Sequence, residues 1–248
     1  MERWQGKVCV VTGASSGIGS AVCVALAGAG LAVVGLARRT HLVDELKVEV
    51  KGKGTICSRH CDVSKAEDVA AAFTWVEKHF GGVDVLVNNA GALFDGQITD
   101  VGDKTLSEEE ISATIDTNLK GLVFCTRHAV ASMKRRRFDG HIFNISSVVG
   151  HYVPLTKSFN VYPSTKHAVT AFGGSLNNEL AQFQSKIKTT SISPGLVSTA
   201  LAAGLIDQLA LPVLQPRDIA AGVLWALSTP PHVNITELTI NAVEQISL

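Results

Sequence analysis

The sequence of 248 residues carries no net charge, because 22 lysines and arginines balance 22 aspartates and glutamates. Without an excess of positive charge, the chain has no electrostatic basis for binding nucleic acid. The one strongly basic run, residues 134–137, ends a predicted helix, where the helix dipole favours cations. We therefore expect no nucleic-acid partner and interpret this run as a solvated helix end.

Cysteine is also sparse, with five residues, an odd number, and no C-x-x-C pair. Cys57, His60 and Cys61 lie close together in the sequence, but no second group of ligands accompanies them, which disfavours a zinc site. The first residues, Met1–Trp4, do not have the pattern of a signal peptide. We expect a reduced, cytoplasmic protein with no metal site.

Charge is absent from Val8 to Ala37, which raises the alternative of a membrane span. Glycine-rich stretches divide this run into pieces too short to cross a bilayer, so we expect no membrane span. The pieces instead fit a β-α-β unit, with strands at Val8–Val11 and Leu31–Leu36 and a helical pattern between them.

A glycine-rich turn with the spacing T-G-x-x-x-G-x-G joins the first strand to the helix. In a dinucleotide-binding turn Gly13 permits the tight turn, Gly17 lets the backbone approach pyrophosphate, and Gly19 lets the helix pack close to the strand. The free N–H groups of the helix N-terminus are also suited to phosphate. The turn therefore predicts a dinucleotide site.

Arginines stand where the second strand ends. An NAD-binding unit has an acidic residue there for the ribose 2′-hydroxyl, whereas this chain has Ala37 followed by Arg38 and Arg39. A guanidinium fork suits a 2′-phosphate, so we predict NADP(H). The alternative is that the two arginines only begin a solvated helix.

Strand and helix patterns alternate along the rest of the chain, which indicates a parallel sheet. We predict an α/β fold with one Rossmann-type doubly wound parallel sheet of about seven strands, helices on both faces, and a single domain over residues 1–248. Further strands are expected at residues 55–61, 83–87, 141–146, 187–193 and 237–241, and helices at 65–79, 111–137 (one or two abutting), 161–184 and 217–227.

Tyr162 and Lys166 are four residues apart in a predicted helix and so lie on one face. A phenol pKa near 10 is too high for a general base at neutral pH, and a neighbouring ammonium is expected to lower it. Tyr152 has no lysine four residues ahead, so we interpret it as a pocket-lining residue. A serine hydroxyl ending the strand before them, from Ser146 or Ser147, would stabilise charge on a reacting oxygen.

These motifs, in this order along essentially the whole chain, resemble those of short-chain dehydrogenases/reductases. The resemblance places the catalytic role on Ser147 rather than Ser146, with Tyr162 as acid/base and Lys166 as its partner. It also matches Asn118 to an asparagine that anchors a water leading from the lysine to solvent.

The resemblance also implies a set of cofactor contacts spread over the strand ends. Asp62 and Val63 match the adenine contact, and Pro194 to Thr199 match the turn around the carboxamide. The full set is Gly13, Ser15, Ser16, Gly17, Ile18, Gly19, Arg38, Arg39, Asp62, Val63, Asn89, Ala90, Gly91, Tyr162, Lys166, Pro194, Gly195, Val197 and Thr199.

Shorter stretches, among them residues 34–38, 150–154 and 227–230, resemble the branch containing insect farnesol dehydrogenases and animal steroid and carbonyl reductases. That branch implies a small hydrophobic alcohol or carbonyl substrate, either a farnesol-like terpenoid or a 3- or 17-ketosteroid. The substrate lid is expected at about residues 195–215, where Leu201, Leu205, Ile206, Leu209 and Leu211 are apolar.

A non-catalytic NADP(H)-binding sensor on the same fold is the alternative from another functional class, although a sensor has no need of a proton relay. The resemblance further implies a homodimer or homotetramer, with the helices at 111–137 and 161–184 as its interface.

Overall fold

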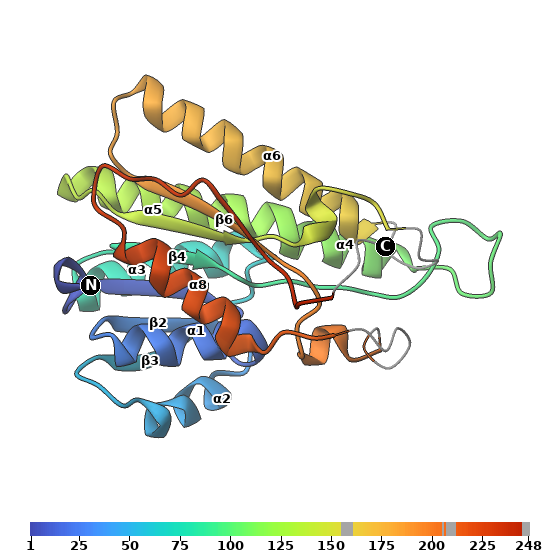
Figure 1. Cartoon of the computed structure of the whole chain (residues 1–248), viewed down its shortest axis with the longest axis horizontal. Coiled ribbons are helices and arrows are strands. Elements are labelled where there is room, and N and C mark those ends of the chain that lie inside the picture. The colour runs from blue at the N-terminus through green and yellow to red at the C-terminus, as the bar shows by residue number, and fades with distance from the viewer. Residues whose placement is uncertain (155–160, 205, 207–211, 245–248) are drawn as a thin grey trace.

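The computed structural model describes residues 1–154, 161–204, 206 and 212–244 of the chain (Figure 1). Its strands form one seven-stranded sheet in the order β3-β2-β1-β4-β5-β6-β7, and every adjacent pair is parallel. The strands are β1 (Val8–Thr12), β2 (Ala32–Ala37), β3 (Thr55–His60), β4 (Val85–Asn88), β5 (His141–Ile145), β6 (Lys188–Pro194) and β7 (Glu237–Ile240).

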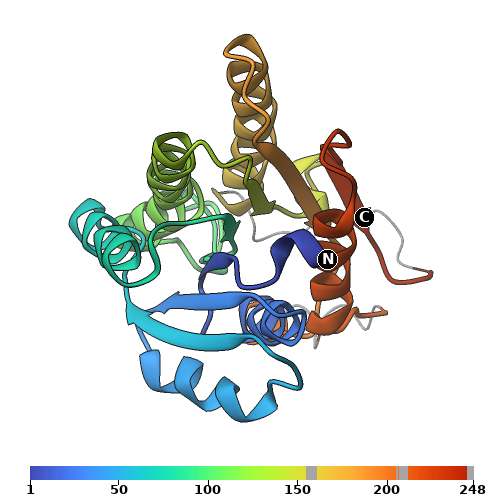
Figure 2. The ribbon, with the colours of Figure 1, turned by 90° about the vertical axis from the view of Figure 1, so that its left-hand side faces the viewer.

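Helices cover both faces of this sheet, which confirms the predicted doubly wound fold (Figures 1 and 2). The longer helices are α1 (Gly17–Gly28), α3 (Ala66–Phe80), α4 (Glu108–Ile115), α5 (Leu122–Arg136), α6 (Val161–Gln182) and α8 (Pro216–Ser228). The shorter ones are η1 (Glu2–Trp4), α2 (Thr40–Glu45), η2 (Leu46–Glu49), η3 (Asp116–Gly121), η4 (Val148–Gly150) and η5 (Ala200–Ala202).

The strands β1, β2 and β4 are short apolar runs because both of their faces are buried. In β1, Cys9 and Val11 belong to the core beneath α1 and α8, whereas Val8 and Val10 belong to the core beneath α3, α5 and α6. Parallel strands between two helical layers show this pattern. The same pattern let the sequence locate these strands to within one or two residues.

The predicted helix over residues 111–137 is two helices joined by a π-helical turn. Helix α4 begins three residues earlier than expected, at Glu108, where Ser107 and Glu110 form a capping box. The turn η3 then separates α4 from α5. A π turn is a local insertion in an α-helix, which hydrophobic periodicity does not reveal.

The strand order reverses direction between β1 and β4, so the carboxyl ends of these two strands open a crevice where ligands bind in such sheets. The segment from β4 to α4 projects beyond the body of the molecule at this end (Figure 1). Backbone hydrogen bonds from Gln97 to the Lys104 carbonyl and from Leu106 to the Gln97 carbonyl join the two sides of this projection in an isolated parallel bridge.

At the opposite end of the sheet, Asp84 is a buried carboxylate with two partners. It accepts hydrogen bonds from the Val8 backbone at 2.8 Å and from Arg136 Nη1 at 2.7 Å. We expect Asp84→Ala to lower the free energy of unfolding by about 3 kcal/mol, because the part-buried Arg136 guanidinium loses its carboxylate and keeps only the Val83 carbonyl.

Urea unfolding followed by circular dichroism measures this loss. Lys47→Ala is the matched control, because Lys47 and Asp44 form an exposed pair at 2.7 Å whose removal should cost less than about 1 kcal/mol. Equal losses in the two variants would contradict a stabilising role for the buried pair.

Candidate active site

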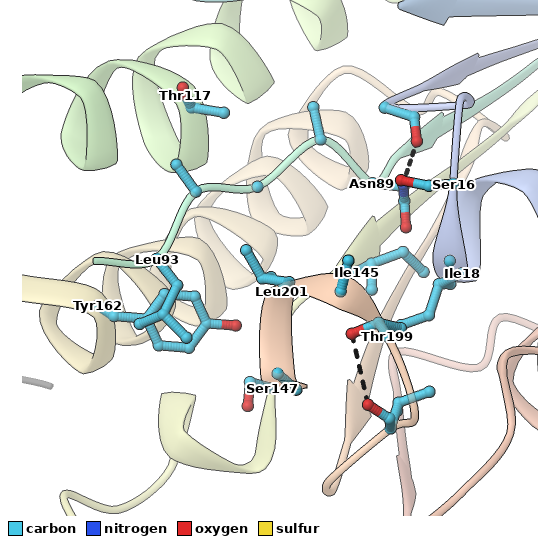
Figure 3. Close-up of a pocket in the computed structure, with 18 of the residues that line it drawn as sticks. Ser16, Ile18, Asn89, Leu93, Thr117, Ile145, Ser147, Tyr162, Thr199 and Leu201 are labelled. Atoms are coloured by element: carbon cyan, nitrogen blue, oxygen red, sulfur yellow. Dashed lines mark hydrogen bonds between the residues drawn. The ribbon is translucent and has the colours of Figure 1, made fainter. Parts of the chain in front are cut away.

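One cavity of about 430 Å³ opens at the carboxyl ends of the strands. The glycine-rich turn lines one side, and the residues around Tyr162 line the other (Figure 3). Figure 3 shows the Tyr162 hydroxyl pointing into this space, with Leu93 and Leu201 near it and Ser16, Ile18 and Asn89 across from it. The structure thus brings the two predicted halves of the site together.

The glycine-rich turn takes a shape that side chains would prevent. Gly13 has a φ of 64°, and a Cβ there would lie 2.8 Å from the Ala90 Cα. A Cβ on Gly19 would overlap the Gly13 carbonyl oxygen, so this glycine allows α1 to pack onto the turn, as predicted. Gly19 itself is buried and does not line the cavity.

Helix α1 begins at Gly17 and has no acidic side chain in its first turn. Its N-terminal N–H groups and the positive end of its dipole therefore suit an anion in the cavity. Ser15, Ser16, Gly17 and Ile18 all line the cavity at this point. The turn fits a dinucleotide phosphate.

Both predicted arginines line the same end of the cavity. Arg39 Nη2 donates to the hydroxyls of Ser15 at 3.3 Å and Ser16 at 3.4 Å, so its guanidinium is held over the glycine turn. Burial alone would raise the pKa of Asp62, but hydrogen bonds from Ser64 and the nearby charge of Arg38 outweigh it and lower that pKa. At this end of the cavity Arg38 and Arg39 supply two cations, and Ala37 stands where an NAD-binding unit has a carboxylate. This lining fits a 2′-phosphate.

Hydrogen bonds tie the glycine turn to the segment after β4. The Thr12 hydroxyl accepts from the backbone N–H groups of Asn89 and Ala90, both at 3.0 Å. The Asn89 side chain donates to the carbonyls of Thr12 at 3.0 Å and Gly13 at 3.2 Å. Thr12 was not among the predicted site residues, although its place before Gly13 in the motif was a usable signal.

Ser147 follows β5, and Tyr162 and Lys166 project from the first turns of α6 into the cavity. Burial raises the pKa of Tyr162 to about 12, opposed by a hydrogen bond with Ser147. Burial lowers the pKa of Lys166 to about 8. The Tyr162 phenol, the Ser147 hydroxyl and the buried amine of Lys166 thus share one cavity.

The expected lowering of the Tyr162 pKa by Lys166 is not found here. The Lys166 Nζ lies 5.5 Å from the centre of the Tyr162 ring and donates to the Ile145 carbonyl at 2.9 Å. The ammonium is therefore bonded to β5 and not to the phenol oxygen. Desolvation is then the largest influence on the pKa of Tyr162. The structure therefore contradicts that expectation, because the pKa of Tyr162 is raised.

Asn118 lies in η3 but does not line the cavity, and it is 2% exposed. Its amide oxygen accepts from the Ala92 backbone N–H at 2.7 Å, and its Nδ2 donates to the Ala92 carbonyl at 3.0 Å. Nδ2 also donates to the Thr165 hydroxyl at 3.1 Å. The side chain thus joins three segments of the protein.

The remaining predicted residues fall where the sequence placed them. Val63, Gly91, Pro194, Gly195, Val197 and Thr199 line the cavity, as does Tyr152. The cavity also includes residues that the sequence did not single out, among them Phe94, Thr117 and Val149. Their chemistry is ordinary for loops and helices, so nothing in the sequence marked them.

The predicted lid is described only in part. Leu201 and Ala202 line the cavity, whereas Leu205, Leu209 and Leu211 lie outside the described residues, as does Lys157. Within the described ranges, no group of three or more His, Cys, Asp or Glu side chains could hold a metal ion. Helices of the described chain are also too short or too polar to span a membrane.

Comparison with known proteins agrees with this geometry. A family model described as short chain dehydrogenase matches residues 7–210. A farnesol dehydrogenase of Aedes aegypti is 49% identical over 98% of each chain, and a mouse protein named dehydrogenase/reductase SDR family member 11 is 39% identical over 100% of this chain and 98% of its own.

Solved structures show the same likeness. An alcohol dehydrogenase from the archaeon Thermococcus sibiricus, complexed with 5-hydroxy-NADP, has a TM-score of 0.84 at 31% identity, covering 98% of this chain and 100% of its own. The closed form of a serine dehydrogenase complexed with NADP⁺ has a TM-score of 0.83 at 30% identity, covering 96% of each chain.

The lowered pKa of Lys166 predicts a pH-dependent stability. The folded protein holds this group with a pKa of about 8, against an ordinary value of 10.5, so the unfolded chain binds more protons between these values. The contribution of Lys166 to stability is therefore complete above about pH 10.5 and is lost as the pH falls to about 8. Lys166→Met should remove this dependence.

Urea unfolding of both proteins at half-unit steps from about pH 7 to 11 tests the prediction. The unfolding free energy of the wild type, measured relative to that of Lys166→Met, should increase as the pH rises through that window. A difference that stays constant with pH would show that Lys166 has an ordinary pKa in the folded protein.

Proposed function

This chain belongs to the short chain dehydrogenase family, and we propose that it interconverts a hydrophobic alcohol and its carbonyl with NADP(H), using Asn118, Ser147, Tyr162 and Lys166. One observation carries the proposal. Ser147, Tyr162 and Lys166 meet in the same cavity as the glycine-rich turn, so a hydroxyl pair that can handle a substrate oxygen lies beside a dinucleotide site.

The cofactor is NADP(H), as the sequence predicted. When bound, it supplies or accepts the hydride. The turn from Gly13 to Ile18 and the N-terminus of α1 would hold its pyrophosphate, and Arg38 and Arg39 its 2′-phosphate. We propose the other predicted contacts, from Asp62 to Thr199, as lining for the rest of the molecule.

The side chains of this protein would handle the substrate oxygen and its proton. The hydroxyls of Tyr162 and Ser147 line the same cavity, and Ser147 acts on the pKa of the phenol, so the two could bind that oxygen together. With a pKa of about 12, Tyr162 is protonated at neutral pH and suited to donate its proton to an alkoxide. Alcohol oxidation instead requires the phenolate, whose formation Lys166 would assist if its ammonium approached the phenol oxygen.

A hydrophobic substrate fits the part of the cavity around Tyr162. Leu93 and Phe94 come from the segment after β4, Val149 and Pro154 from the segment after β5, and Leu201 from η5. We propose a terpenoid alcohol such as farnesol, which the mosquito relative's name supports. A ketosteroid is the alternative substrate in this apolar space.

A non-catalytic NADP(H) sensor remains the alternative from another class. The complete set of Asn118, Ser147, Tyr162 and Lys166 argues against it, because binding alone does not require acid/base groups.

We also propose one domain with an integral substrate site and a lid at about residues 195–215. A cytoplasmic homodimer or homotetramer completes the proposal, with the helices at residues 111–137 and 161–184 at the subunit interface.

Removing the Tyr162 hydroxyl tests the chemistry. We expect Tyr162→Phe to lower kcat about 1,000-fold or more, because the proton donor is lost, while NADPH affinity stays within about twofold. Absorbance of NADPH follows turnover with farnesol, farnesal, straight-chain aldehydes and ketosteroids, and NADPH fluorescence follows binding. Tyr152→Phe is the control, because it removes the other tyrosine of the cavity.

A Tyr162→Phe variant with wild-type kcat would refute the assigned acid/base. Tight NADPH binding by the wild type without turnover of any compound in the panel would favour the sensor.

Replacing both arginines tests the cofactor assignment. Arg38→Ala combined with Arg39→Ala should weaken NADP⁺ binding about 10- to 100-fold and change NAD⁺ binding little, because charged hydrogen bonds to the 2′-phosphate are lost. Isothermal titration with both nucleotides measures the ratio. Lys65→Ala is the control for the loss of a positive charge near the site. The charge of Lys65 also lowers the pKa of Asp62, but Lys65 does not line the cavity. An equal loss for both nucleotides would contradict the assignment.

A further inference from the structure

A buried chain of hydrogen bonds runs behind the catalytic side chains and ends at Tyr162. Its central member is Thr165, the residue before Lys166 on α6. Thr165 is 4% exposed and does not line the cavity. It therefore has no direct access to a substrate.

Each group in this chain has a defined direction. The Ala92 N–H donates to Asn118 Oδ1, and Asn118 Nδ2 donates both to the Ala92 carbonyl and to Thr165 Oγ1. Thr165 Oγ1 has one hydrogen, which it donates to the Tyr162 carbonyl at 2.8 Å. The Thr165 hydroxyl therefore acts both as an acceptor, from the Asn118 amide, and as a donor, to the Tyr162 carbonyl.

The chain connects three segments that shape the site. Ala92 precedes Leu93 and Phe94, which line the cavity. Asn118 belongs to the π turn η3, and Thr165 lies in the first turns of α6, which packs against η3. The backbone of Tyr162 is thereby linked to the cavity wall after β4 through two side chains.

We propose that Thr165 is a positioning residue that holds Tyr162 in line with Ser147 and couples it to Asn118. This inference rests on the proposed function. Tyr162 lies near the start of α6, and a hydroxyl bonded to its carbonyl restrains the turn that aims its phenol. A misplacement of about 1 Å at a reacting group costs on the order of 100-fold in rate, so a restraint of this kind matters for kcat.

The amide of Asn118 also acts through this chain. It is hydrogen-bonded to the two backbone groups of Ala92 and to the Thr165 hydroxyl. Replacing Asn118 or Thr165 breaks the same connection. Two residues that act through one connection should show non-additive effects when both are replaced.

Thr165→Val tests the positioning role, because it removes the hydroxyl while keeping the branched shape. We expect kcat to fall about 10- to 100-fold with unchanged NADP⁺ affinity. Thr165→Ser keeps the hydroxyl and should restore most of the loss. Thr114→Val is the matched control, because Thr114 is 2% exposed and makes the same type of bond on α4, to the Glu110 carbonyl at 2.8 Å.

A second readout does not depend on turnover. The chain has two tyrosines, so Tyr162 is the only one left in Tyr152→Phe, and its ionisation can be followed by absorbance near 295 nm after a rapid pH jump. Burial holds its pKa at about 12. A loosened first turn should bring more water to the phenol, so Thr165→Val should move this pKa down towards 10. Thr114→Val in the same background should leave it in place.

The double variant Asn118→Ala, Thr165→Val should lose no more activity than the worse of the two single variants. A wild-type kcat and an unmoved Tyr162 pKa in Thr165→Val would overturn the proposal, as would losses that Thr114→Val matches or that Thr165→Ser fails to restore. If the wild type turned over no substrate, the proposed function would fail, while the absorbance titration would still decide whether Thr165 positions Tyr162.

Discussion

The site depends on one set of hydrogen bonds between the ends of two adjacent strands. At the end of β1 the Thr12 hydroxyl accepts from the two N–H groups that follow β4, and Asn89 returns two bonds to the carbonyls of Thr12 and Gly13. These bonds lie where the strand order reverses, and they fix the glycine turn against the opposite cavity wall. A side chain on Gly13 would strike the Ala90 backbone, so the motif and the neighbouring strand constrain each other.

The second constraint is the burial of two ionisable groups side by side. Burial raises the pKa of Tyr162 and lowers that of Lys166, so in both cases the neutral form is favoured. These shifts oppose the pairing of phenolate with ammonium that alcohol oxidation requires. These protonation states suit the proposed transfer of a proton from Tyr162 to a substrate oxygen, and the Lys166 bond to Ile145 would have to change for the proposed reverse direction.

The sequence predicted the fold well because the signals were local. Strands buried on both faces appear as short apolar runs, and glycine spacing identifies the turn that requires it. The π turn η3 and the partners of Asn118 were not predictable in this way. Resemblance located Asn118, but its bonds join Ala92, 26 residues away, and Thr165, 47 residues away, and such pairings depend on tertiary packing. The effect of Lys166 on Tyr162 was misjudged for the same reason, because spacing on a helix does not specify where an ammonium finds its acceptor.

Chemistry and specificity are carried by different parts of this fold. The groups that we propose for the substrate oxygen stand at the end of β5 and on α6, where packing and hydrogen bonds leave few alternatives. The apolar wall that meets the rest of the substrate comes from three separate connections, represented by Phe94, Val149 and Leu201. Connections of this kind can change length and side chains without disturbing the sheet. The residues of the motifs therefore indicate a reaction, whereas the proposed choice between a terpenoid and a steroid would depend on the side chains that these three connections present to the cavity.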